Sequence, residues 1–420
     1  MERIVARYYI ETPYAVEKAA TALAGEQSSG TFVMVPGETE ELKNRFAARV
    51  EHIEPLETVS EPAIPGATSP DGVYRRATVD VSWSVENFGH NLPTLISTLQ
   101  GNLYEITQFT GLKLMDIHFP ESYVNNYRGP RFGINGSRSL THVAPGRPLL
   151  GTIIKPSVGL TPAQTAEIVD TLAQAGIDFV KDDELMASTA NSPFEDRVDA
   201  VMRVINRHAD RTGKKVMYAF NISDELEPML RKYDYVLQSG GTCAMISLNS
   251  IGLAGAKRIC DLSELAIHGH RNGWGMLNRH PLLGIEFPAY QKLWRLAGVD
   301  QLHVNGIQNK FWESDDSVVR SIASCLDAAP LDKPVLPVVS SGQWGGQAFE
   351  TYRRTQTTDL LYMAGGGIMA HPGGPAAGVT ALQQAWEGAV GGLTMEEAAR
   401  QYPEFGGSVE KFGKLQIHRA

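Results

Sequence analysis

The feature that most constrains the fold is a regular alternation of short apolar segments with helical segments, beginning near Pro148. Apolar segments of strand length recur over about 240 residues, and this pattern is typical of a (β/α)8 barrel. In chain order they read PLLGTIIKP, DFVKDDE, KVMYAFNI, TCAMISLNS, LAIHGH, QLHVNG, VLPVVSSG and DLLYMAGGG. An open doubly wound sheet is the alternative, but it more often has a glycine fingerprint after its first strand, which IIKPSVGL lacks. The sequence therefore predicts an α/β fold with a (β/α)8 (TIM) barrel.

The residues before this alternation have a different pattern. RIVARYYIE, YRRATVDVSWSV and GLKLMDIHFP read as strands, whereas AVEKAATALAGEQ and LPTLISTLQGNLYEIT read as helices. This order suggests a ferredoxin-like sheet, and the turn residues of YVNNYRGPRFGINGSRS mark a domain connection. We therefore expect an N-terminal ferredoxin-like α+β domain over residues 1–130 and the barrel as catalytic domain over residues 131–420.

Charge and composition exclude several classes of function. The formal net charge is -9 and no basic tract occurs, so we expect no nucleic-acid partner. No stretch approaches the roughly 18 apolar residues of a membrane span, and the N-terminus lacks the apolar run of a signal peptide. The three cysteines match no zinc motif, and buried thiols fit a reducing compartment. These features predict a cytoplasmic protein without a membrane partner.

Polar residues collect where the predicted barrel strands end, which is where barrel enzymes place their catalytic groups. In chain order these are Lys155; Lys181, Asp183 and Glu184; Asn221; His268, His270 and Arg271; His303; Ser340, Ser341 and Gly342; and Gly365, Gly366 and Gly367. Each group alone has an ordinary structural interpretation, such as a solvated turn or a structural histidine. Because seven of the eight strand ends carry such a group, we expect a composite active site there.

The residue types at these ends indicate a metal and an anion. Two neighbouring carboxylates, Asp183 and Glu184, suit a hard Mg²⁺ ion. Glycine N–H groups after the last two strands suit a phosphate, and Arg271 with His303 could hold a second anion. The lysine in Lys181-Asp182-Asp183-Glu184 is unexpected, because an ammonium cannot ligate a cation. From the residues alone, this segment could be a solvated loop tip or part of a metal site.

Several of these motifs, taken together, resemble a known family. GTIIKPSVGL, DFVKDDE, IHGHR, LHVNG, PVVSSG and GGGIMAHPGG are similar, in order and spacing, to the motifs of the RuBisCO large chain. The resemblance covers nearly the whole chain and includes GEQSSGTF in the N-terminal region. In that family the lysine of the acidic segment reacts with CO2 to give a carbamate. The resemblance implies that Lys181, as carbamate, binds Mg²⁺ together with Asp183 and Glu184.

The resemblance also implies roles for other residues, position by position. Lys155 matches a proton-shuttling lysine, Arg271 a phosphate-binding arginine, and Lys310 a lysine in the loop after the sixth strand. His268, His270 and His303 match histidines of the family's site. Matches to substrate- and phosphate-binding residues are Ser340, Gly342, Gly365 and Gly366. Glu26, Thr31 and Asn102 match residues that complete the site of a neighbouring subunit, so a homodimer or larger homo-oligomer with shared active sites is implied.

Some positions depart from the carboxylating enzymes. Ser157 stands where they have a second lysine, and GIQNKFWES replaces their loop that ends in GKLEG. Phe32 stands in place of a tryptophan that contacts phosphate, and Trp274 in place of a histidine. These departures indicate a RuBisCO-like protein (form IV) that does not fix CO2 efficiently but acts on another phosphorylated substrate.

Three hypotheses for the activity follow from this resemblance. The first is decarboxylation or C–C hydrolysis of a phosphorylated keto sugar acid, such as 3-oxo-isoapionate 4-phosphate, through an enediolate or enolate. The second is enolase or isomerase chemistry on a methylthio-pentulose phosphate in methionine salvage. The third is a non-catalytic regulatory role. Lys310 favours the first, because this lysine faces the carboxylate or CO2 end of the reacting molecule in the family.

Overall fold

The computed structural model describes residues 2–29, 36–262 and 264–414, and these form two compact units. The first unit comprises Met1–Arg128, Gly273–Ala297 and Ala329–Asp332. The second comprises Gly129–Asn272, Gly298–Ala328 and Lys333–Ala420. Two segments distant from the N-terminus thus belong to the first unit.

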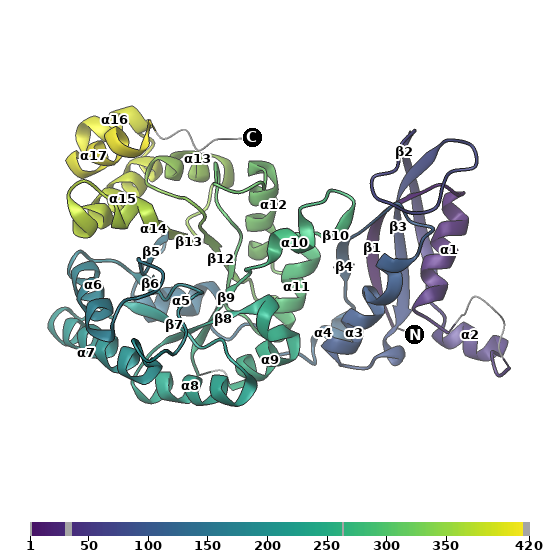
Figure 1. Cartoon of the computed structure of the whole chain (residues 1–420), viewed down its shortest axis with the longest axis horizontal. Coiled ribbons are helices and arrows are strands. Elements are labelled where there is room, and N and C mark those ends of the chain that lie inside the picture. Colours follow the sequence, from purple (N-terminus) through teal and green to yellow (C-terminus); the bar gives the residue numbers. More distant parts are fainter. Residues whose placement is uncertain (1, 30–35, 263, 415–420) are drawn as a thin grey trace. The chain divides into compact units, whose positions relative to one another are not determined.

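The first unit is built around a five-stranded sheet with the order β10-β4-β1-β3-β2 (Figure 1). Its neighbours are antiparallel except β10 and β4, which run parallel. The order β4-β1-β3-β2 is that of a ferredoxin-like sheet. The elements are β1 (Arg3–Thr12), α1 (Val16–Glu26), α2 (Glu40–Phe46), β2 (Arg49–Val59), β3 (Tyr74–Ser84), η1 (Val85–Asn87), α3 (Leu92–Leu99), η2 (Gly101–Glu105), β4 (Gly111–His118), α4 (Glu121–Val124), α10 (Trp274–Asn278), β10 (Leu283–Ile285) and α11 (Phe287–Ala297).

Two strands of this sheet were not anticipated from the sequence. None of the β2 residues is buried, so the strand lacks the alternation of apolar and polar residues that marks a half-buried strand. β10 has three residues, and its pairing with β4 joins positions about 170 residues apart. Neither strand has a local sequence pattern strong enough to predict it without the tertiary structure.

The second unit contains a closed barrel of eight parallel strands, as the alternating pattern predicted (Figure 1). The strands follow one another around the barrel in chain order, and β13 closes the ring by pairing with β5. They are β5 (Leu149–Ile153), β6 (Phe179–Lys181), β7 (Met217–Asn221), β8 (Cys243–Ser247), β9 (Ala266–His270), β11 (Gln301–His303), β12 (Leu336–Val339) and β13 (Leu361–Met363). The predicted fold class is therefore confirmed.

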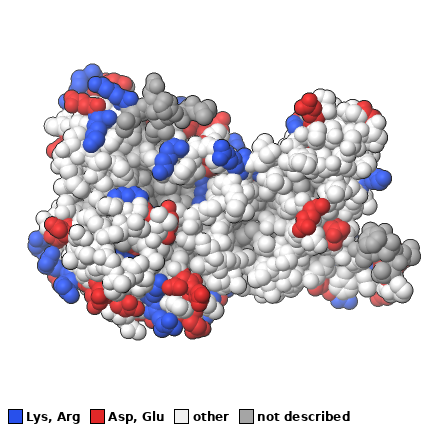
Figure 2. Space-filling model, viewed as in Figure 1, with Lys and Arg blue, Asp and Glu red and all other residues white. Residues whose placement is uncertain are grey.

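The helices of this unit surround the barrel, and the last of them follow its final strand (Figure 1). They are α5 (Gly133–Thr141), α6 (Pro162–Gln174), α7 (Phe194–Thr212), α8 (Leu226–Gln238), α9 (Leu248–Leu262), α12 (Asp315–Leu326), α13 (Gly346–Thr355), α14 (Gly365–Met369), α15 (Gly374–Val390), α16 (Met395–Gln401) and α17 (Pro403–Phe412). A capping box between Thr161 and Gln164 starts α6, with Pro162 in its first turn. No helix in the described parts of the chain has the length and apolarity needed to cross a membrane. Charged side chains of both signs are interspersed on the face of the molecule shown in Figure 2.

The alternation of side chains along each strand determines which residues point into the barrel. Phe179, Met217, Ala266 and Val338 belong to the apolar cluster inside the barrel, so residues two positions further along the same strands also point inward. Those residues are Lys181, Ala219, His268 and Ser340, and the next step reaches Asn221 and His270. The interior is thus apolar at its base and becomes polar toward the carboxyl ends of the strands.

Candidate active site

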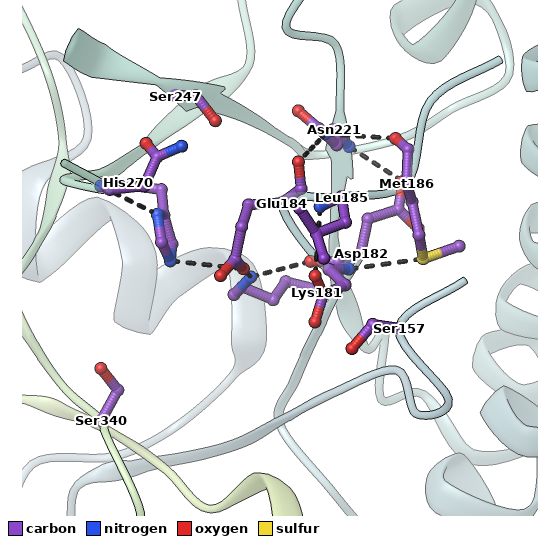
Figure 3. A network of polar contacts seen from close by, with 12 residues as sticks. Ser157, Lys181, Asp182, Glu184, Leu185, Met186, Asn221, Ser247, His270 and Ser340 are labelled. Carbon is purple, nitrogen blue, oxygen red and sulfur yellow. Dashed lines mark hydrogen bonds and ion pairs between the residues drawn. The ribbon is translucent and has the colours of Figure 1, made fainter. Parts of the chain in front are cut away.

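The centre of the candidate site is Lys181, the last residue of β6. Its side chain is 1% exposed, and its Nζ donates to the Asp182 carbonyl at 2.8 Å and to Glu184 Oε2 at 3.2 Å (Figure 3). Burial lowers the pKa of the Lys181 ammonium, although the carboxylates of Glu184 and Asp183 oppose the shift. A lysine that loses its proton more readily is a better nucleophile toward CO2 than an exposed one.

Lys155 and Asp183 form an ion pair across the first two strands of the barrel. Lys155 Nζ donates to Asp183 Oδ2 at 2.6 Å and to Ser157 Oγ at 2.7 Å. The Asp183 side chain is 4% exposed, whereas that of Lys155 is 42% exposed. The ammonium can therefore reach both the carboxylate and solvent, which is where a substrate would enter.

The two aspartates of the acidic segment have different environments. Asp182 is fully buried and accepts hydrogen bonds from the Tyr218 hydroxyl at 2.6 Å and the Asn221 N–H at 2.9 Å, with Arg197 Nη2 at 3.4 Å. Its charge is already satisfied by the fold, so Asp182 is structural. Asp183 and Glu184, by contrast, lie in the loop that leaves β6 and direct their carboxylates toward Lys155 and Lys181.

His270 completes this group from β9. Its Nε2 lies 3.4 Å from Glu184 Oε2, and its Nδ1 accepts the Asn272 N–H at 3.2 Å (Figure 3). This bond leaves the Nε2–H to face Glu184. Burial lowers the pKa of His270 to about 4 and outweighs the opposing effect of the Glu184 carboxylate. His270 is therefore a neutral ring near neutral pH, with its Nε2 within 3.4 Å of the Glu184 carboxylate.

The other two predicted histidines lie one layer deeper. His268 Nε2 and His303 Nε2 are 2.8 Å apart, His268 Nδ1 is 2.9 Å from Gln301 Oε1, and His303 Nδ1 is 3.0 Å from Ser340 Oγ. Burial lowers the pKa of His268 to about 3 and that of His303 well below the usual value. Both rings are neutral parts of a buried hydrogen-bond chain that ends at Ser340.

Arg271 is engaged by a residue that the sequence analysis did not single out. Its Nη2 donates to Glu313 Oε2 at 2.7 Å, and the two side chains are 5% and 0% exposed. Asn305 and Ser317 also donate to the Glu313 carboxylate, at 2.6 and 2.9 Å. An anion at Arg271 would therefore compete with a buried carboxylate held by several donors.

Lys310 lies against the turn that follows β12. Its N–H donates to the Ser341 carbonyl at 3.2 Å, and a Cβ atom on Gly342 would stand 3.2 Å from Lys310 Cβ. Gly342 has a φ of +80°, a conformation that favours glycine. Gly365 and Gly366 begin the short helix α14, and a Cβ atom on Gly366 would meet no protein atom within 4 Å. A ligand can thus approach the Gly366 backbone closely.

The residues predicted to serve a neighbouring subunit lie in the first unit. Glu26 ends α1 and Asn102 lies in η2, and both are exposed. Gln27, with its amide oriented to satisfy both of its polar atoms, accepts the Asn102 N–H at 2.9 Å, so the two segments are adjacent. Thr31 and Phe32 lie outside the described residues.

The donor set fits Mg²⁺ if Lys181 is modified. Among the described residues, no three His, Cys, Asp or Glu side chains are grouped in a way that could hold a metal ion. Asp183 and Glu184 supply two carboxylates, each now paired with a lysine ammonium. Conversion of the buried Lys181 ammonium to a carbamate would remove one positive charge and add oxygen ligands, which is the donor type that Mg²⁺ prefers.

The family is decided by the match to two domain models. The model of the ribulose bisphosphate carboxylase large chain, catalytic domain, matches residues 133–412, and the model of the N-terminal domain matches residues 1–123. The chain belongs to the RuBisCO large-chain family. The family that the sequence motifs indicated is thereby confirmed.

Relatives of this RuBisCO-family chain have informative names. It is 50% identical to the 3-oxo-isoapionate-4-phosphate decarboxylase of Rhizobium etli, with 97% of this chain and 98% of that protein covered. It is 52% identical to the 3-oxo-isoapionate-4-phosphate transcarboxylase/hydrolase of Xanthobacter autotrophicus, with 96% and 97% covered.

Solved structures of the RuBisCO family share the whole fold. A rubisco-like protein from Burkholderia fungorum is 43% identical with a TM-score of 0.91, covering 98% of this chain and 100% of that one. A dimeric archaeal Rubisco from Hyperthermus butylicus is 29% identical with a TM-score of 0.86, covering 99% and 96%. The rubisco-like protein MtnW from Alicyclobacillus acidocaldarius is 27% identical with a TM-score of 0.85, covering 98% and 100%.

Sequence analysis of this RuBisCO-family chain missed Gln301 and Glu313. Gln301 opens the three-residue strand Gln-Leu-His, and a glutamine at a position that should point into the barrel core is a signal that could have been noticed. Glu313 lies in the divergent loop after β11, where an isolated glutamate gives no indication that its side chain is buried.

Proposed function

We propose that this chain is a Mg²⁺-dependent RuBisCO-like enzyme that cleaves a carbon–carbon bond of 3-oxo-isoapionate 4-phosphate, by decarboxylation or hydrolysis. The observation that carries the proposal is the cluster of Lys155, buried Lys181, Asp183 and Glu184 at the carboxyl ends of β5 and β6. The chain is also about half identical to two enzymes with that substrate in their names.

Each residue has a defined task in this proposal. Asp183, Glu184 and the carbamate of Lys181 hold Mg²⁺, which when bound supplies an electrophile that stabilises negative charge developing on substrate oxygens. Lys155 Nζ delivers or removes the proton at the reacting carbon, because it is the partly exposed ammonium beside this group. His270, with its Nε2 3.4 Å from Glu184 Oε2, assists at a substrate hydroxyl.

The substrate's charged groups bind at the ends of β12 and β13, and β13 pairs with β5, the strand that precedes Lys155. Backbone N–H groups of Gly342, Gly365 and Gly366 bind the phosphate, and Gly366 leaves room for it. Lys310 orients the departing carboxylate with its ammonium. The pairing of Arg271 with Glu313 supports a substrate with one phosphate, because a second phosphate would have to displace a buried carboxylate.

A homodimer or larger homo-oligomer is part of the proposal. Glu26 and Asn102 are exposed and lie on adjacent segments of the first unit, as expected of residues that complete a partner's site. The similarity to a dimeric archaeal Rubisco supports the same assembly.

The enolase or isomerase hypothesis is less well supported. The chain is 27% identical to MtnW but 50% and 52% identical to the two isoapionate enzymes. The non-catalytic hypothesis leaves the paired lysines and carboxylates unexplained. A partly exposed ion pair such as that of Lys155 and Asp183 contributes little to the free energy of unfolding, so stability alone does not account for it.

The test is an assay of purified protein with Mg²⁺ and bicarbonate. We expect CO2 release or a cleaved acid from 3-oxo-isoapionate 4-phosphate, and little turnover of a methylthio-pentulose phosphate. With ribulose bisphosphate we expect no useful incorporation of labelled CO2, since Ser157 and the altered loop after β11 lack the groups of the carboxylating enzymes. Turnover of the methylthio compound alone would favour the alternative.

A further inference from the structure

A buried hydrogen-bond chain connects Gln301, at the start of β11, to Ser340, just after β12. Its links are Gln301 Oε1 to His268 Nδ1 at 2.9 Å, His268 Nε2 to His303 Nε2 at 2.8 Å, and His303 Nδ1 to Ser340 Oγ at 3.0 Å. Gln301 and His268 are fully buried, and His303 and Ser340 are 5% and 6% exposed. Every link has a donor and an acceptor, so the position of one proton determines the next.

The orientation of the Gln301 amide is the starting point. Its Nε2 lies 3.3 Å from Met217 Sδ and 3.0 Å from Ser137 Oγ. A thioether sulfur can only accept a hydrogen bond, so the orientation with the amide nitrogen toward Met217 is the one that gives this nitrogen two acceptors. The amide oxygen therefore faces His268, and because this oxygen only accepts, the proton of the neutral His268 ring has to be on Nδ1.

The remaining protons follow in sequence. With its proton on Nδ1, His268 presents a bare Nε2, which accepts the Nε2–H of His303. His303 then presents a bare Nδ1, which accepts the hydroxyl proton of Ser340. The Ser340 proton is thus directed into the protein. Ser341 Oγ, 3.4 Å from Ser340 Oγ, gives its own proton to Asn305 Oδ1 at 2.7 Å.

We propose that Gln301 is a positioning residue that acts through His268 and His303 to make Ser340 Oγ a hydrogen-bond acceptor toward the substrate. Ser340 then accepts a hydrogen bond from a substrate hydroxyl and cannot donate one to a carbonyl. The site thereby prefers a substrate with a hydroxyl group beside Ser340 over one with an oxo group there. Only this last, substrate-facing step rests on the proposed function.

The chain holds its direction because both rings stay neutral. Burial lowers the pKa of His268 and of His303, so neither ring keeps an extra proton near neutral pH. No proton is transferred along the chain in this proposal. Its role is to orient one hydroxyl, and the reacting proton is left to Lys155.

The direct test is neutron diffraction from a deuterium-exchanged crystal of the whole protein, which needs no substrate. We expect deuterium on His268 Nδ1, on His303 Nε2 and on Ser340 Oγ pointing at His303. Deuterium on His303 Nδ1 would overturn the proposal. Because this measurement involves no turnover, it distinguishes failure of the chain from failure of the proposed substrate.

A double-mutant cycle tests the consequence for catalysis. Gln301→Met should lower kcat/KM on 3-oxo-isoapionate 4-phosphate by about 10-fold or more, the effect of losing one buried hydrogen bond. In a Ser340→Ala background, the same change should alter kcat/KM by less than about threefold, because the hydroxyl that Gln301 orients is already gone. Additive effects would overturn the proposal. Gln291→Met is the matched control and should leave kcat/KM unchanged. Gln291 is equally buried, at 1% exposed, but it lies in α11 of the first unit and is not part of the hydrogen-bond chain.

Discussion

Lys155 Nζ lies 2.6 Å from Asp183 Oδ2, so the end of β5 and the loop after β6 are joined by an ion pair at the centre of the candidate site. Metal binding by Asp183 would compete with Lys155 for this carboxylate. The ammonium would then be available to the substrate. Proton transfer by Lys155 and metal loading are therefore expected to be linked through one carboxylate.

Replacing Lys155 with methionine should separate bond cleavage from protonation. Lys155→Met keeps an unbranched side chain that is one atom shorter and removes the acid, so cleavage should persist while protonation of the resulting enolate slows. Single-turnover measurements of CO2 release and of final product, on the same sample, check this. Equal loss of both signals would show that Lys155 acts before the bond breaks.

Lys181 and Asp182 should differ in their effect on stability. Lys181→Ala should abolish the activation by Mg²⁺ and CO2 and leave the protein folded, because the buried Lys181 side chain is not part of the apolar cluster inside the barrel. Asp182→Ala should lower the free energy of unfolding by about 3–5 kcal/mol, since it leaves buried Arg197 without its carboxylate. Urea unfolding of both variants measures the difference.

The carbamate itself can be checked on the wild-type protein. Activity should require CO2 and Mg²⁺ together, because the carboxylates of Asp183 and Glu184 do not complete a metal site without a third ligand. Full activity in an assay rigorously free of both would contradict the proposed role of Lys181.

Lys310 should distinguish decarboxylation from isomerisation. Lys310→Met should slow cleavage of the β-keto acid by about 10²-fold if the ammonium supplies a few kcal/mol in the transition state. Gly342→Ala should act in the same direction, because its Cβ would press on Lys310 and its φ of +80° disfavours alanine. An unaffected rate for Lys310→Met on the acid would rule out the decarboxylase account.

Two inactive variants should restore activity when mixed if the site is shared between subunits. Lys181→Ala removes the metal site of one subunit, and Asn102→Ala removes the residue that the other supplies. Mixed oligomers contain some sites in which both residues are intact, so part of the activity should return. Absence of activity after confirmed subunit exchange would show that each subunit has a complete site.

Stability should fall in mild acid because of His268. Burial lowers the pKa of His268 from 6.5 to about 3, so the unfolded chain binds a proton that the folded protein does not. The contribution of His268 to the free energy of unfolding is fully present above pH 6.5 and is lost as the pH falls toward 3. Between pH 7 and 5 this loss amounts to about 2 kcal/mol. Urea unfolding of His268→Gln should show a smaller loss over this interval. The exposed His52, changed to Gln, is the control and should behave as the wild type.

The sequence alone was enough to predict the barrel and the location of the site. Each strand and helix has its own periodicity, and the carboxyl ends of parallel strands necessarily meet at one end of a barrel. The sequence therefore predicts that Lys155, Lys181 and His270 lie close together. The exposed strand β2 and the short strand β10 could not be predicted, because their residues carry little local signal.

Only the tertiary structure decided what each polar residue does. Asp182 and Asp183 are neighbours with the same chemistry, but packing buries Asp182 against Tyr218 and Arg197 and leaves Asp183 facing Lys155. Likewise, Glu313 neutralises Arg271, and Gln301 orients the histidines, through contacts between residues far apart in the chain. Sequence patterns report local periodicity, whereas the charge and proton position of a side chain depend on partners that only the folded chain brings within hydrogen-bonding distance.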